Sequence, residues 1–356
     1  QPLSVRCLRQ YRSGRPGRIV KTFEYDAATA VDDAVARLAR DEHAMLLGGG
    51  TNLVDLMKLG VSSPSTLIDV TRLPLHDVEV VADGSLRIGA AVTNSDLAVH
   101  PVVRQRYPVL SRAVLSGASG QLRNMATTGG NLFQRTRCVY FMDSSKPCNK
   151  REPGSGCPAR TGEHRNLAIL GASQACVATH PSDMAVALSA LDARIVVRGV
   201  DGERVLAIDD FFRLPGDEPE RDNTVARDEI VTAIEIPKPT ATAVSTYRKV
   251  RDRQSYAFAV ASVAAVLDVE DGIVRGVSIA LGGVAHKPWR AHTAEHALLG
   301  SAAEEASFRR AMALELDSAE PLRDNAFKIP LVINLVARTL VELVESSATK
   351  EMGDRS

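Results

Sequence analysis

The sequence predicts an α+β fold in two parts that divide near residue 240. At 356 residues, the chain is too long for a single hydrophobic core. Up to residue 239, short apolar runs alternate with segments of helical spacing. Beyond residue 240, three segments that look like antiparallel strands precede three helical segments, which predicts a three-stranded antiparallel sheet with a three-helix bundle.

Composition and charge argue against several classes of protein. Lys plus Arg and Asp plus Glu are both 43, so the chain lacks the basic excess typical of nucleic-acid binding. Aromatic residues make up 4%, too few for a platform on which single-stranded bases stack. No apolar run reaches the length of a membrane span, and the first residues lack the apolar stretch of a secretory signal. We therefore expect no nucleic-acid partner and no membrane insertion.

The N-terminal elements follow from apolar spacing. Residues 1–19 carry five arginines and no periodicity, so a flexible extension with a free thiol at Cys7 is expected. The fold is predicted to begin with a strand at residues 19–23. A helix capped by Thr29 follows, because apolar residues recur at helical spacing after it. These residues are Val31, Ala34, Val35 and Leu38.

A β-α-β pattern comes next, made of a buried strand at residues 45–47, a helix at 53–59 and a strand at 66–70. We then predict a strand at 86–92, a short helix capped by Asn94, and a longer helix at 102–115. Residues 117–131 are small and polar, and no regular element is expected there.

The later elements follow in the same way. The predicted elements are a helix at 181–191, strands at 194–199 and 229–237, antiparallel strands at 247–251, 257–269 and 273–282, and helices at 293–299, 304–316 and 328–346. The turn Glu270-Asp271-Gly272 is a hairpin signal between the last two strands.

Two glycine turns are candidate binding elements. The first is LLGGGTNL at residues 46–53, and the second is TTGGN at residues 127–131. Glycines let a backbone approach a diphosphate closely and direct successive N–H groups at it. Neither turn matches the dinucleotide fingerprint or the phosphate loop. Each is therefore open to two interpretations, a tight turn or a phosphate cradle.

Four of the five cysteines fall in one polar segment, spaced Cys138-x9-Cys148-x8-Cys157-x18-Cys176. Thiolates are soft ligands, and four of them suit an iron–sulfur cluster or zinc. No gap is as short as the two to four residues usual at structural zinc sites. Chemistry alone leaves an iron–sulfur cluster, zinc, and unliganded or disulfide-forming thiols open. The segment shows no core of its own, so metal ligation would order it.

The two glycine motifs, LGGGTNL at 47–53 and LRNMATTGGNL at 122–132, resemble the FAD motifs of the flavin subunit in the xanthine dehydrogenase, or molybdenum hydroxylase, family. Carbon monoxide dehydrogenase has a subunit of the same kind, and the resemblance covers residues 20–345. The cysteine segment is similar to that of one subgroup, the FAD subunits of periplasmic aldehyde oxidoreductases, which carry an additional [4Fe–4S] cluster.

The resemblance implies a PCMH-type, two-part FAD-binding domain followed by a C-terminal domain of the CO dehydrogenase flavoprotein type. Residues 20–60 would be the first FAD-binding subdomain. Residues 61–239 would be the second, with a cysteine-rich iron–sulfur insert at 134–180. Residues 240–356 would form the C-terminal domain.

The resemblance also implies roles for individual residues. The FAD contacts would be Leu46, Leu47, Gly48, Gly49, Gly50, Thr51, Asn52, Leu53, Ala118, Thr127, Thr128, Gly129, Gly130, Asn131, Asp183, Val231 and Lys249. The [4Fe–4S] ligands would be Cys138, Cys148, Cys157 and Cys176. Some relatives have an aromatic residue where Gly117 stands, so stacking from that point is absent. Tyr256 is a candidate neighbour of the flavin ring, although a core position is favoured for it.

The implied function is that of an electron-transfer subunit in a heterotrimeric aldehyde oxidoreductase. A molybdenum-cofactor large subunit would oxidise the aldehyde, and a small subunit with two [2Fe–2S] centres would pass electrons to FAD. An external acceptor, a protein such as ferredoxin or oxygen, would take them. Two alternatives are a zinc-stapled scaffold and a stand-alone FAD oxidase. The resemblance implies a periplasmic location through a partner's export signal, with the cytoplasm as the alternative.

Overall fold

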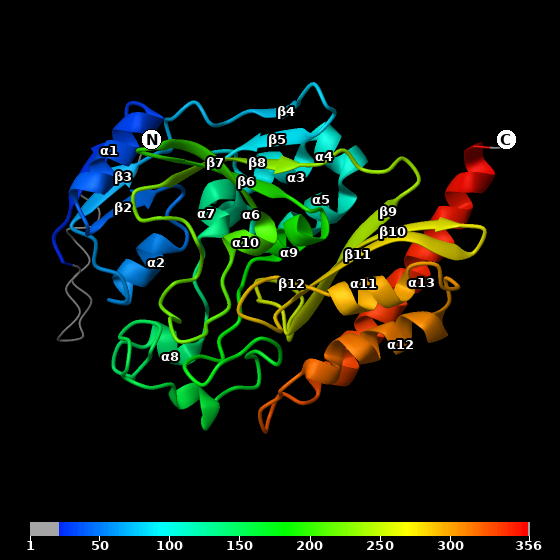
Figure 1. Cartoon of the computed structure of the whole chain (residues 1–356). Helices are drawn as coiled ribbons and strands as arrows, with labels where there is room; N and C mark the ends of the chain where they lie inside the picture. The colour runs from blue at the N-terminus through cyan, green and yellow to red at the C-terminus, as the bar shows by residue number, and fades with distance from the viewer. Residues whose placement is uncertain (1–20, 355–356) are drawn as a thin grey trace.

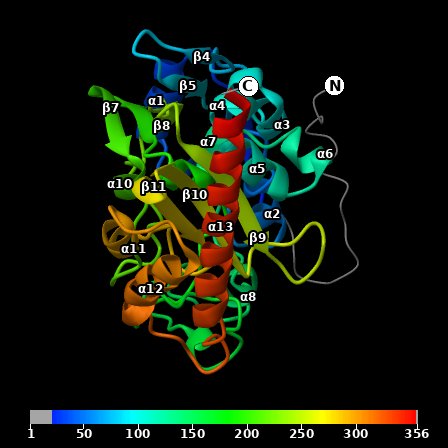
Figure 2. The ribbon, with the colours of Figure 1, turned by 90° about the vertical axis from the view of Figure 1, so that its right-hand side faces the viewer.

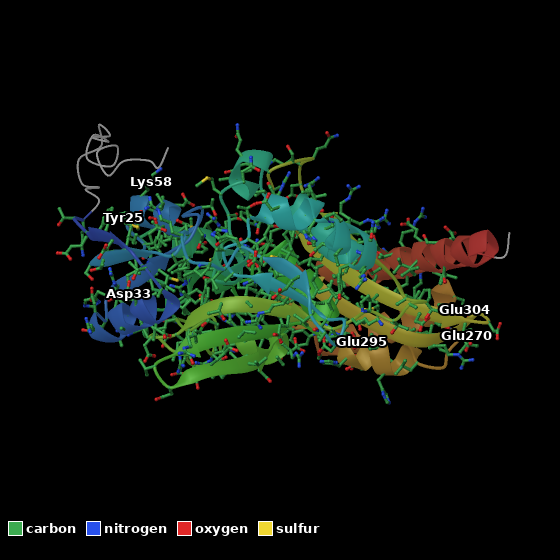
Figure 3. All side chains as sticks on the ribbon, turned by 90° about the horizontal axis from the view of Figure 1, so that it is seen from above. Tyr25, Asp33, Lys58, Glu270, Glu295 and Glu304 are labelled. Atoms are coloured by element: carbon green, nitrogen blue, oxygen red, sulfur yellow. The ribbon has the colours of Figure 1, made fainter. Side chains whose placement is uncertain are left out.

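The computed structural model describes residues 21–354, with side chains described up to residue 347. Three units follow one another along the molecule (Figure 1). Seen from above (Figure 3), Tyr25, Asp33 and Lys58 of the first unit lie at one end, and Glu270, Glu295 and Glu304 of the last lie at the other. The middle unit therefore separates the two ends and contacts both. The extension predicted at residues 1–19, with Cys7, lies outside the described residues.

The first unit is a parallel sheet with strand order β1-β3-β2. Its elements are β1 (Glu24–Ala27), α1 (Val31–Arg40), β2 (Ala44–Leu47), α2 (Leu53–Lys58) and β3 (Thr66–Asp69). The predicted helix is confirmed, and α1 buries Ala34, Val35 and Leu38 against the sheet. The strand predicted at 19–23 is wrong within the described residues, because β1 begins at Glu24 and pairs with β3 from there.

Two predicted helix caps are also wrong. Thr29 accepts no bond from α1. Its amide and hydroxyl donate to the Asp33 carboxylate instead, and Ala30 is the N-cap residue. Asn94 already lies inside α3 (Asn94–Val99), and the Thr93 hydroxyl accepts from the Asp96 amide at 3.1 Å. The residue that caps is the one with an extended backbone just before the helix.

The middle unit is a five-stranded antiparallel sheet with strand order β4-β5-β8-β6-β7. Its strands are β4 (Val78–Val80), β5 (Leu86–Gly89), β6 (Arg194–Gly199), β7 (Gly202–Ala207) and β8 (Ile230–Ile236). Its helices are α3, α4 (Pro101–Arg106), α5 (Pro108–Ser116), α6 (Gly120–Arg123), α7 (Thr128–Leu132), α9 (Asp183–Ala190) and α10 (Ile208–Phe211). Residues of the sheet and helices share one core.

Two predictions for the middle unit fail for local reasons. The helix predicted at 102–115 is two helices, because Pro108 lacks an amide donor and Tyr107 before it leaves the helical conformation. The segment 117–131, predicted to be irregular, contains α6 and α7. Side chains of Ser119 and Thr127 cap these short helices, which is how small polar residues start a helix.

The C-terminal unit is an antiparallel sheet of β9 (Val244–Val250), β10 (Ala261–Glu270), β11 (Ile273–Gly282) and β12 (Trp289–Arg290). The three predicted strands are present, and the two-residue β12 adds a fourth. Three helices follow, α11 (His292–Leu298), α12 (Glu305–Glu315) and α13 (Lys328–Asp354), with the 3-10 turn η3 (Leu316–Ser318). In Figure 2, α13 runs along the sheet. None of the helices in the described ranges is both long enough and apolar enough to cross a membrane.

The sheet of the C-terminal unit is covered on both faces. One face buries Val263, Ala265 and Leu267 against the helices that follow it. The other face adds Tyr247, Ala264 and Ala280 to the core of the middle unit. The chain therefore crosses residue 240 without separating two independent cores, and a side chain on β9 can complete a site on the middle unit.

The insert at residues 134–180 holds α8 (Val139–Met142) and the 3-10 turn η2 (Pro158–Arg160). The expectation that this segment lacks a core is wrong. Three of its cysteines pack with Phe141, Ala159 and Val177, and Leu56 of α2 joins them. Buried cysteines pack as small apolar residues, and the prediction of a polar loop did not take this into account.

A buried lysine joins this insert to the C-terminal unit and predicts a pH dependence. Lys328 is fully buried, and its Nζ donates to the carbonyls of Leu167 at 2.9 Å and Gly283 at 2.7 Å. Burial lowers the pKa of Lys328 to about 7. Between about pH 7 and about pH 10, Lys328 is neutral in the folded chain but still protonated in the unfolded chain. The free energy of unfolding therefore rises with pH across this window.

We expect Lys328→Met to flatten the rise in melting temperature between about pH 7 and about pH 9. Its overall stability should fall by about 1–3 kcal/mol, because two buried carbonyls lose their donor. Thermal unfolding over a pH series measures both effects. An unchanged slope in the variant would assign the pH dependence to other groups.

Candidate functional site

The two glycine turns pack directly against each other. A Cβ atom on Gly49 would lie 1.6 Å from the carbonyl oxygen of Met125, and one on Gly48 would lie 2.8 Å from Thr127 Oγ1. Gly50 has a φ of +71°, in the left-handed region that favours glycine. Glycine is therefore required at position 49 for the two turns to touch, and at position 50 for the backbone conformation of the first turn. The contact brings two backbone segments about 75 residues apart in sequence into one surface.

The second turn is the start of α7, with Thr127 as its N-cap. The Thr127 hydroxyl accepts from the Gly130 amide at 3.1 Å. The Thr128 hydroxyl donates to the Gly89 carbonyl at 2.8 Å, so this buried side chain is directed at β5. The first turn, likewise, leads from β2 into α2. Both glycine turns therefore present the first backbone amides of a helix.

Two clefts meet at these turns. The subdomain cleft, about 760 Å³, lies between the first and middle units. The domain cleft, about 730 Å³, lies between the middle unit and the loop after β9. The residues that line both clefts are Gly50, Thr51, Asn52 and Gly130. Each volume is in the range of small-molecule sites. Because the two clefts share these residues, one elongated ligand could extend from one cleft into the other.

Most predicted FAD contacts lie on these walls. Leu46, Gly48, Gly49, Leu53, Thr127, Gly129 and Val231 line the subdomain cleft in addition to the shared residues. Ala118, Asn131, Asp183 and Lys249 line the domain cleft. Leu47 and Thr128 are on neither wall, and they are adjacent in sequence to residues that are. These positions stay predicted contacts, which the structure has brought together.

The subdomain cleft explains why the strand at residues 45–47 is less buried than predicted. Met45 is 39% exposed, and Leu46 is half-buried. Both residues line the cleft. An apolar run that faces a ligand site has the same sequence pattern as one that faces a core, so the pattern could not separate them.

Unpartnered polar atoms indicate where a polar ligand would bind. Asn52 Nδ2 and Asn94 Oδ1 are buried and lack a hydrogen-bond partner among the described residues. Asn52 lines both clefts, and Asn94 lines the domain cleft. A buried polar atom without a partner costs about 1–3 kcal/mol, which a ligand group could recover. Asn94 was predicted only as a helix cap, so its place at the site was missed.

A buried ion pair closes one wall of the domain cleft. Lys249 Nζ lies 2.7 Å from Asp183 Oδ2, with side-chain exposures of 4% and 8%. The Tyr247 hydroxyl donates to Asp183 Oδ1 at 2.5 Å. Burial raises the pKa of Asp183, and the Lys249 ammonium and the two hydrogen bonds oppose that rise. Burial also raises the pKa of Tyr247 well above its usual value, so the phenol remains a donor.

Tyr247 was not among the predicted site residues. The signal was available, because Tyr247 and Lys249 are two residues apart on one strand and therefore share a face. Tyr256 is placed differently from the core position favoured for it. It is 60% exposed and lines the domain cleft.

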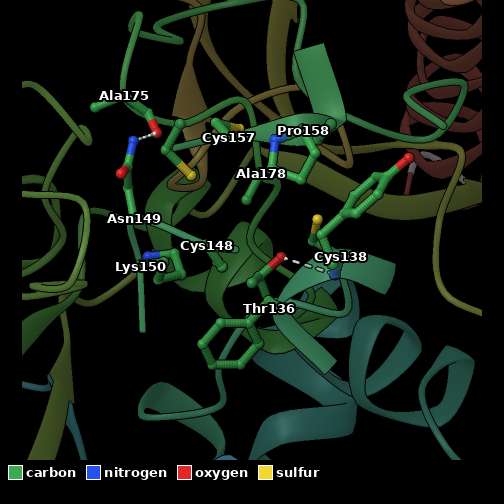
Figure 4. Close-up of a pocket in the computed structure, with 13 residues that line it drawn as sticks. Thr136, Cys138, Cys148, Asn149, Lys150, Cys157, Pro158, Ala175 and Ala178 are labelled. Carbon is green, nitrogen blue, oxygen red and sulfur yellow. Dashed lines mark hydrogen bonds between the residues drawn. The ribbon is translucent and has the colours of Figure 1, made fainter. Parts of the chain in front are cut away.

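The four predicted ligand cysteines line one pocket, together with Lys150 and Asn149 (Figure 4). Cys138, Cys148 and Cys176 are buried. Burial raises the pKa of Cys176 to about 11 and also raises the pKa values of Cys138 and Cys157. Backbone amides oppose these shifts by donating to the sulfurs, from Tyr140 and Phe141 to Cys138, and from Val177, Ala159 and Arg160 to Cys157.

The four thiols line one pocket, but they are not arranged around one point as the ligands of a single metal ion would be. Within residues 21–354, no group of three or more His, Cys, Asp or Glu side chains is arranged to hold a metal ion. A tetrahedral zinc site needs four sulfurs about 2.3 Å from one point. The arrangement of the thiols therefore does not support a zinc site. A cluster of several atoms requires its thiolates farther apart, and its assignment stays a prediction.

A buried charge network lies between the thiol pocket and the subdomain cleft. Lys150 Nζ is 2.5 Å from Asp222 Oδ1, and Arg135 Nε is 2.8 Å from Asp222 Oδ2. Burial tends to raise the pKa of Asp222, but Lys150 and Arg135 outweigh it and lower that pKa to about 2. Lys150 lines the thiol pocket, whereas Arg135 and Asp222 line the subdomain cleft. No sequence signal linked these residues.

Two family models together match all three units of the chain. Residues 21–239 match the family described as "FAD binding domain in molybdopterin dehydrogenase". Residues 245–343 match the "CO dehydrogenase flavoprotein C-terminal domain". The chain is 48% identical over 324 residues to the aldehyde oxidoreductase FAD-binding subunit PaoB of Escherichia coli strain K12, covering 91% of this chain and 98% of that protein.

Solved structures show the same fold. A carbon monoxide dehydrogenase structure from Hydrogenophaga pseudoflava matches with a TM-score of 0.71 and 28% identity, over 90% of this chain and 97% of that one. A reconstituted CO dehydrogenase from Oligotropha carboxidovorans matches with a TM-score of 0.73 and 24% identity, over 92% and 99%. The predicted two-part FAD-binding domain with a C-terminal domain is confirmed. The chain belongs to the FAD-binding subunits of the molybdenum hydroxylase and CO dehydrogenase family, and it is an oxidoreductase subunit.

Proposed function

We propose that FAD lies across the two clefts, with its diphosphate at the glycine turns. The turns supply close backbone approach and helix-start amides, both of which suit a diphosphate. The subdomain cleft carries Leu46, Val70 and Ile230 among its apolar residues, which suits adenine. The domain cleft carries the Asp183–Lys249 pair, which suits the polar edge of the isoalloxazine.

The chain's role is to pass electrons in an aldehyde oxidoreductase, with the aldehyde oxidised on another subunit. Similarity to an aldehyde oxidoreductase subunit over nearly the whole chain carries this proposal. When bound, FAD supplies the redox chemistry. This chain's residues bind and orient it. The Asp183–Lys249 pair would present a carboxylate and an ammonium to the cofactor from one wall of the domain cleft.

Four thiolates, from Cys138, Cys148, Cys157 and Cys176, would hold a [4Fe–4S] cluster. The donor set fits the group, because soft thiolates in one pocket are the usual ligands of such clusters. The amides that donate to Cys138 and Cys157 would stabilise thiolate charge and tune the cluster. Lys150 would add a positive charge at the same pocket.

The position of Cys138 favours a cluster that exchanges electrons with the flavin. Its side chain lines the thiol pocket and also the domain cleft. This ligand would therefore be the point of closest approach between the two cofactors. A cluster that only ordered the insert would need no such shared wall. The relay role rests on the proposed orientation of FAD.

An absorption spectrum and metal analysis of the purified chain test the proposal. We expect flavin bands near about 450 nm, and iron with sulfide. A spectrum without flavin bands would reject FAD binding. Zinc without iron would favour the scaffold alternative, in which the thiols have no redox role.

The Cys148→Ser variant separates the two cofactor sites. We expect it to lose iron and keep FAD, because Cys148 lines the thiol pocket and neither cleft. Iron and flavin content of the purified chain are the measurements, and Cys7→Ser is the matched control. Loss of both cofactors together would show that the cluster holds the insert and the FAD site in place as one structure.

The partners proposed are a molybdenum-cofactor large subunit and a small subunit with two [2Fe–2S] centres. The external acceptor would be a protein such as ferredoxin, or oxygen. Co-purification with two further chains would support the heterotrimer, whereas a chain that oxidises substrate alone would favour a stand-alone FAD oxidase. A periplasmic location is proposed from the resemblance, and cell fractionation distinguishes it from the cytoplasm.

A further inference from the structure

Arg137, in the cysteine-rich insert, has a buried nitrogen without a partner on the wall of the domain cleft. Its Nε is buried and lacks a hydrogen-bond partner among the described residues, and its side chain lines the cleft. The far end of the guanidinium is occupied, because Nη1 donates to Asp55 Oδ2 of α2 at 2.6 Å. A buried donor that stays unpaired costs free energy, which a bound acceptor would recover.

The segment that carries Arg137 follows the first turn of α2. The Arg135 amide donates to Asn52 Oδ1 at 3.1 Å, and Arg137 pairs with Asp55, about one turn farther along the helix. Asn52 lines both clefts, and its Nδ2 is also buried and unpartnered among the described residues. Two unpartnered donors therefore lie on neighbouring segments, close to the residues that the clefts share.

Contacts on both sides hold this segment in place. The Arg135 guanidinium pairs with Asp222 at 2.8 Å and donates to the Glu220 carbonyl at 3.0 Å. The Arg137 guanidinium packs on Phe258, at 5.3 Å from the ring centroid. A side chain that is already fixed loses little conformational freedom when a ligand binds.

The other cations on the cleft walls have different partners. Lys249 pairs with Asp183 at 2.7 Å, and Arg123 Nη1 donates to the Gly117 carbonyl at 2.7 Å. Of the arginines and lysines that line the two clefts within residues 21–354, Arg137 is the one with a buried, unpartnered nitrogen. Arginine nitrogens only donate, so the ligand must bring an acceptor, and phosphate oxygens suit a guanidinium.

We propose that Arg137 Nε donates to a diphosphate oxygen of FAD. The glycine turns offer backbone amides to the diphosphate, and Arg137 would add a charged side-chain donor from the insert, beside Asn52. Resemblance to the family did not include Arg137 among the FAD contacts. The inference rests on the proposed placement of the diphosphate at the glycine turns.

Binding of FAD, ADP and riboflavin to the full-length chain freed of flavin tests the proposal. We expect Arg137→Gln to weaken FAD and ADP by between about tenfold and about a hundredfold, because a charge-assisted hydrogen bond to the diphosphate is lost. Riboflavin, which has no phosphate, should bind as it does to the parent chain. Arg137→Lys keeps the charge but has no donor at the Nε position, so it should also lose affinity for ADP.

Lys58→Gln is the matched control, because Lys58 lines the same cleft, is exposed, and carries the same charge. Its effect on ADP affinity should be less than about twofold, since solvent and salt screen an exposed charge. Parental ADP affinity in Arg137→Gln, or full affinity in Arg137→Lys, would overturn the proposal.

The remaining outcomes identify what would replace the proposal. A loss of riboflavin affinity alone in Arg137→Gln would assign Nε to the flavin ring and overturn the contact with the diphosphate. Equal losses of ADP and riboflavin affinity, together with a lower melting temperature, would overturn it in favour of a structural role. A parent chain that binds none of the three ligands would reject FAD binding itself, and this inference with it.

Discussion

Gly49→Ala is expected to abolish FAD binding. The added methyl carbon would lie 1.6 Å from the Met125 carbonyl oxygen and 2.4 Å from its carbonyl carbon. Both atoms are backbone, so neither turn can relieve the overlap by changing a rotamer. The turns would have to separate, and the surface shared by the two clefts would be lost. Overpacking usually costs about 1–3 kcal/mol, and a backbone overlap of this size should exceed that range.

Flavin content of the purified Gly49→Ala chain is the measurement, and we expect less than about one hundredth of the parental affinity for FAD. Gly276→Ala is the control, because its new Cβ would meet Asp268 Cβ at 3.4 Å, an ordinary contact. Gly48→Ala should have a smaller effect than Gly49→Ala, since its close neighbour is the Thr127 hydroxyl at 2.8 Å. Parental flavin content in Gly49→Ala would mean that the turns do not need to touch.

The sequence predicted the parts of the site that lie within continuous motifs. The glycine turns and the four thiols were found because their residues are close in sequence or of one distinctive type. Asp183 and Lys249 entered only through resemblance to a family, since 65 residues separate them from each other. No local pattern reports a contact of that kind. Tyr247 was missed although it lies two residues from Lys249 on the same strand and completes the hydrogen bonding of Asp183.

The fold shows a similar division. Helix α1 and strands β10 and β11 were predicted correctly because their apolar spacing or hairpin turn is complete within the element. The helices α6 and α7 were missed because each is about one turn long and begins from a side-chain cap. Such short helices depend on neighbouring structure for stability, so their apolar spacing carries little signal.

Asp222→Asn is expected to loosen the insert and to weaken both cofactor sites. Lys150 is 2% exposed, and after the change its ammonium would keep the Pro219 carbonyl but lose its only anionic partner among the described residues. Removing one partner of a buried ion pair typically costs about 3–5 kcal/mol, because the remaining charge stays buried. Arg135 would lose the same carboxylate. The insert holds Lys150 and Arg135, so its attachment to the middle unit should suffer first.

Limited proteolysis within residues 134–180, melting temperature, and iron and flavin content measure this prediction. Glu218→Gln is the matched control, because Glu218 in the same segment is exposed and its ion pair with the half-buried Arg213 is expected to contribute no more than about 1 kcal/mol. Combining Asp222→Asn with Lys150→Met should recover part of the lost stability, since the unpaired buried charge is then removed. If Asp222→Asn melts within a degree or two of the parent (a change well under about 1 kcal/mol), the charge network would not be what attaches the insert to the middle unit. The surrounding packing would then hold the insert in place.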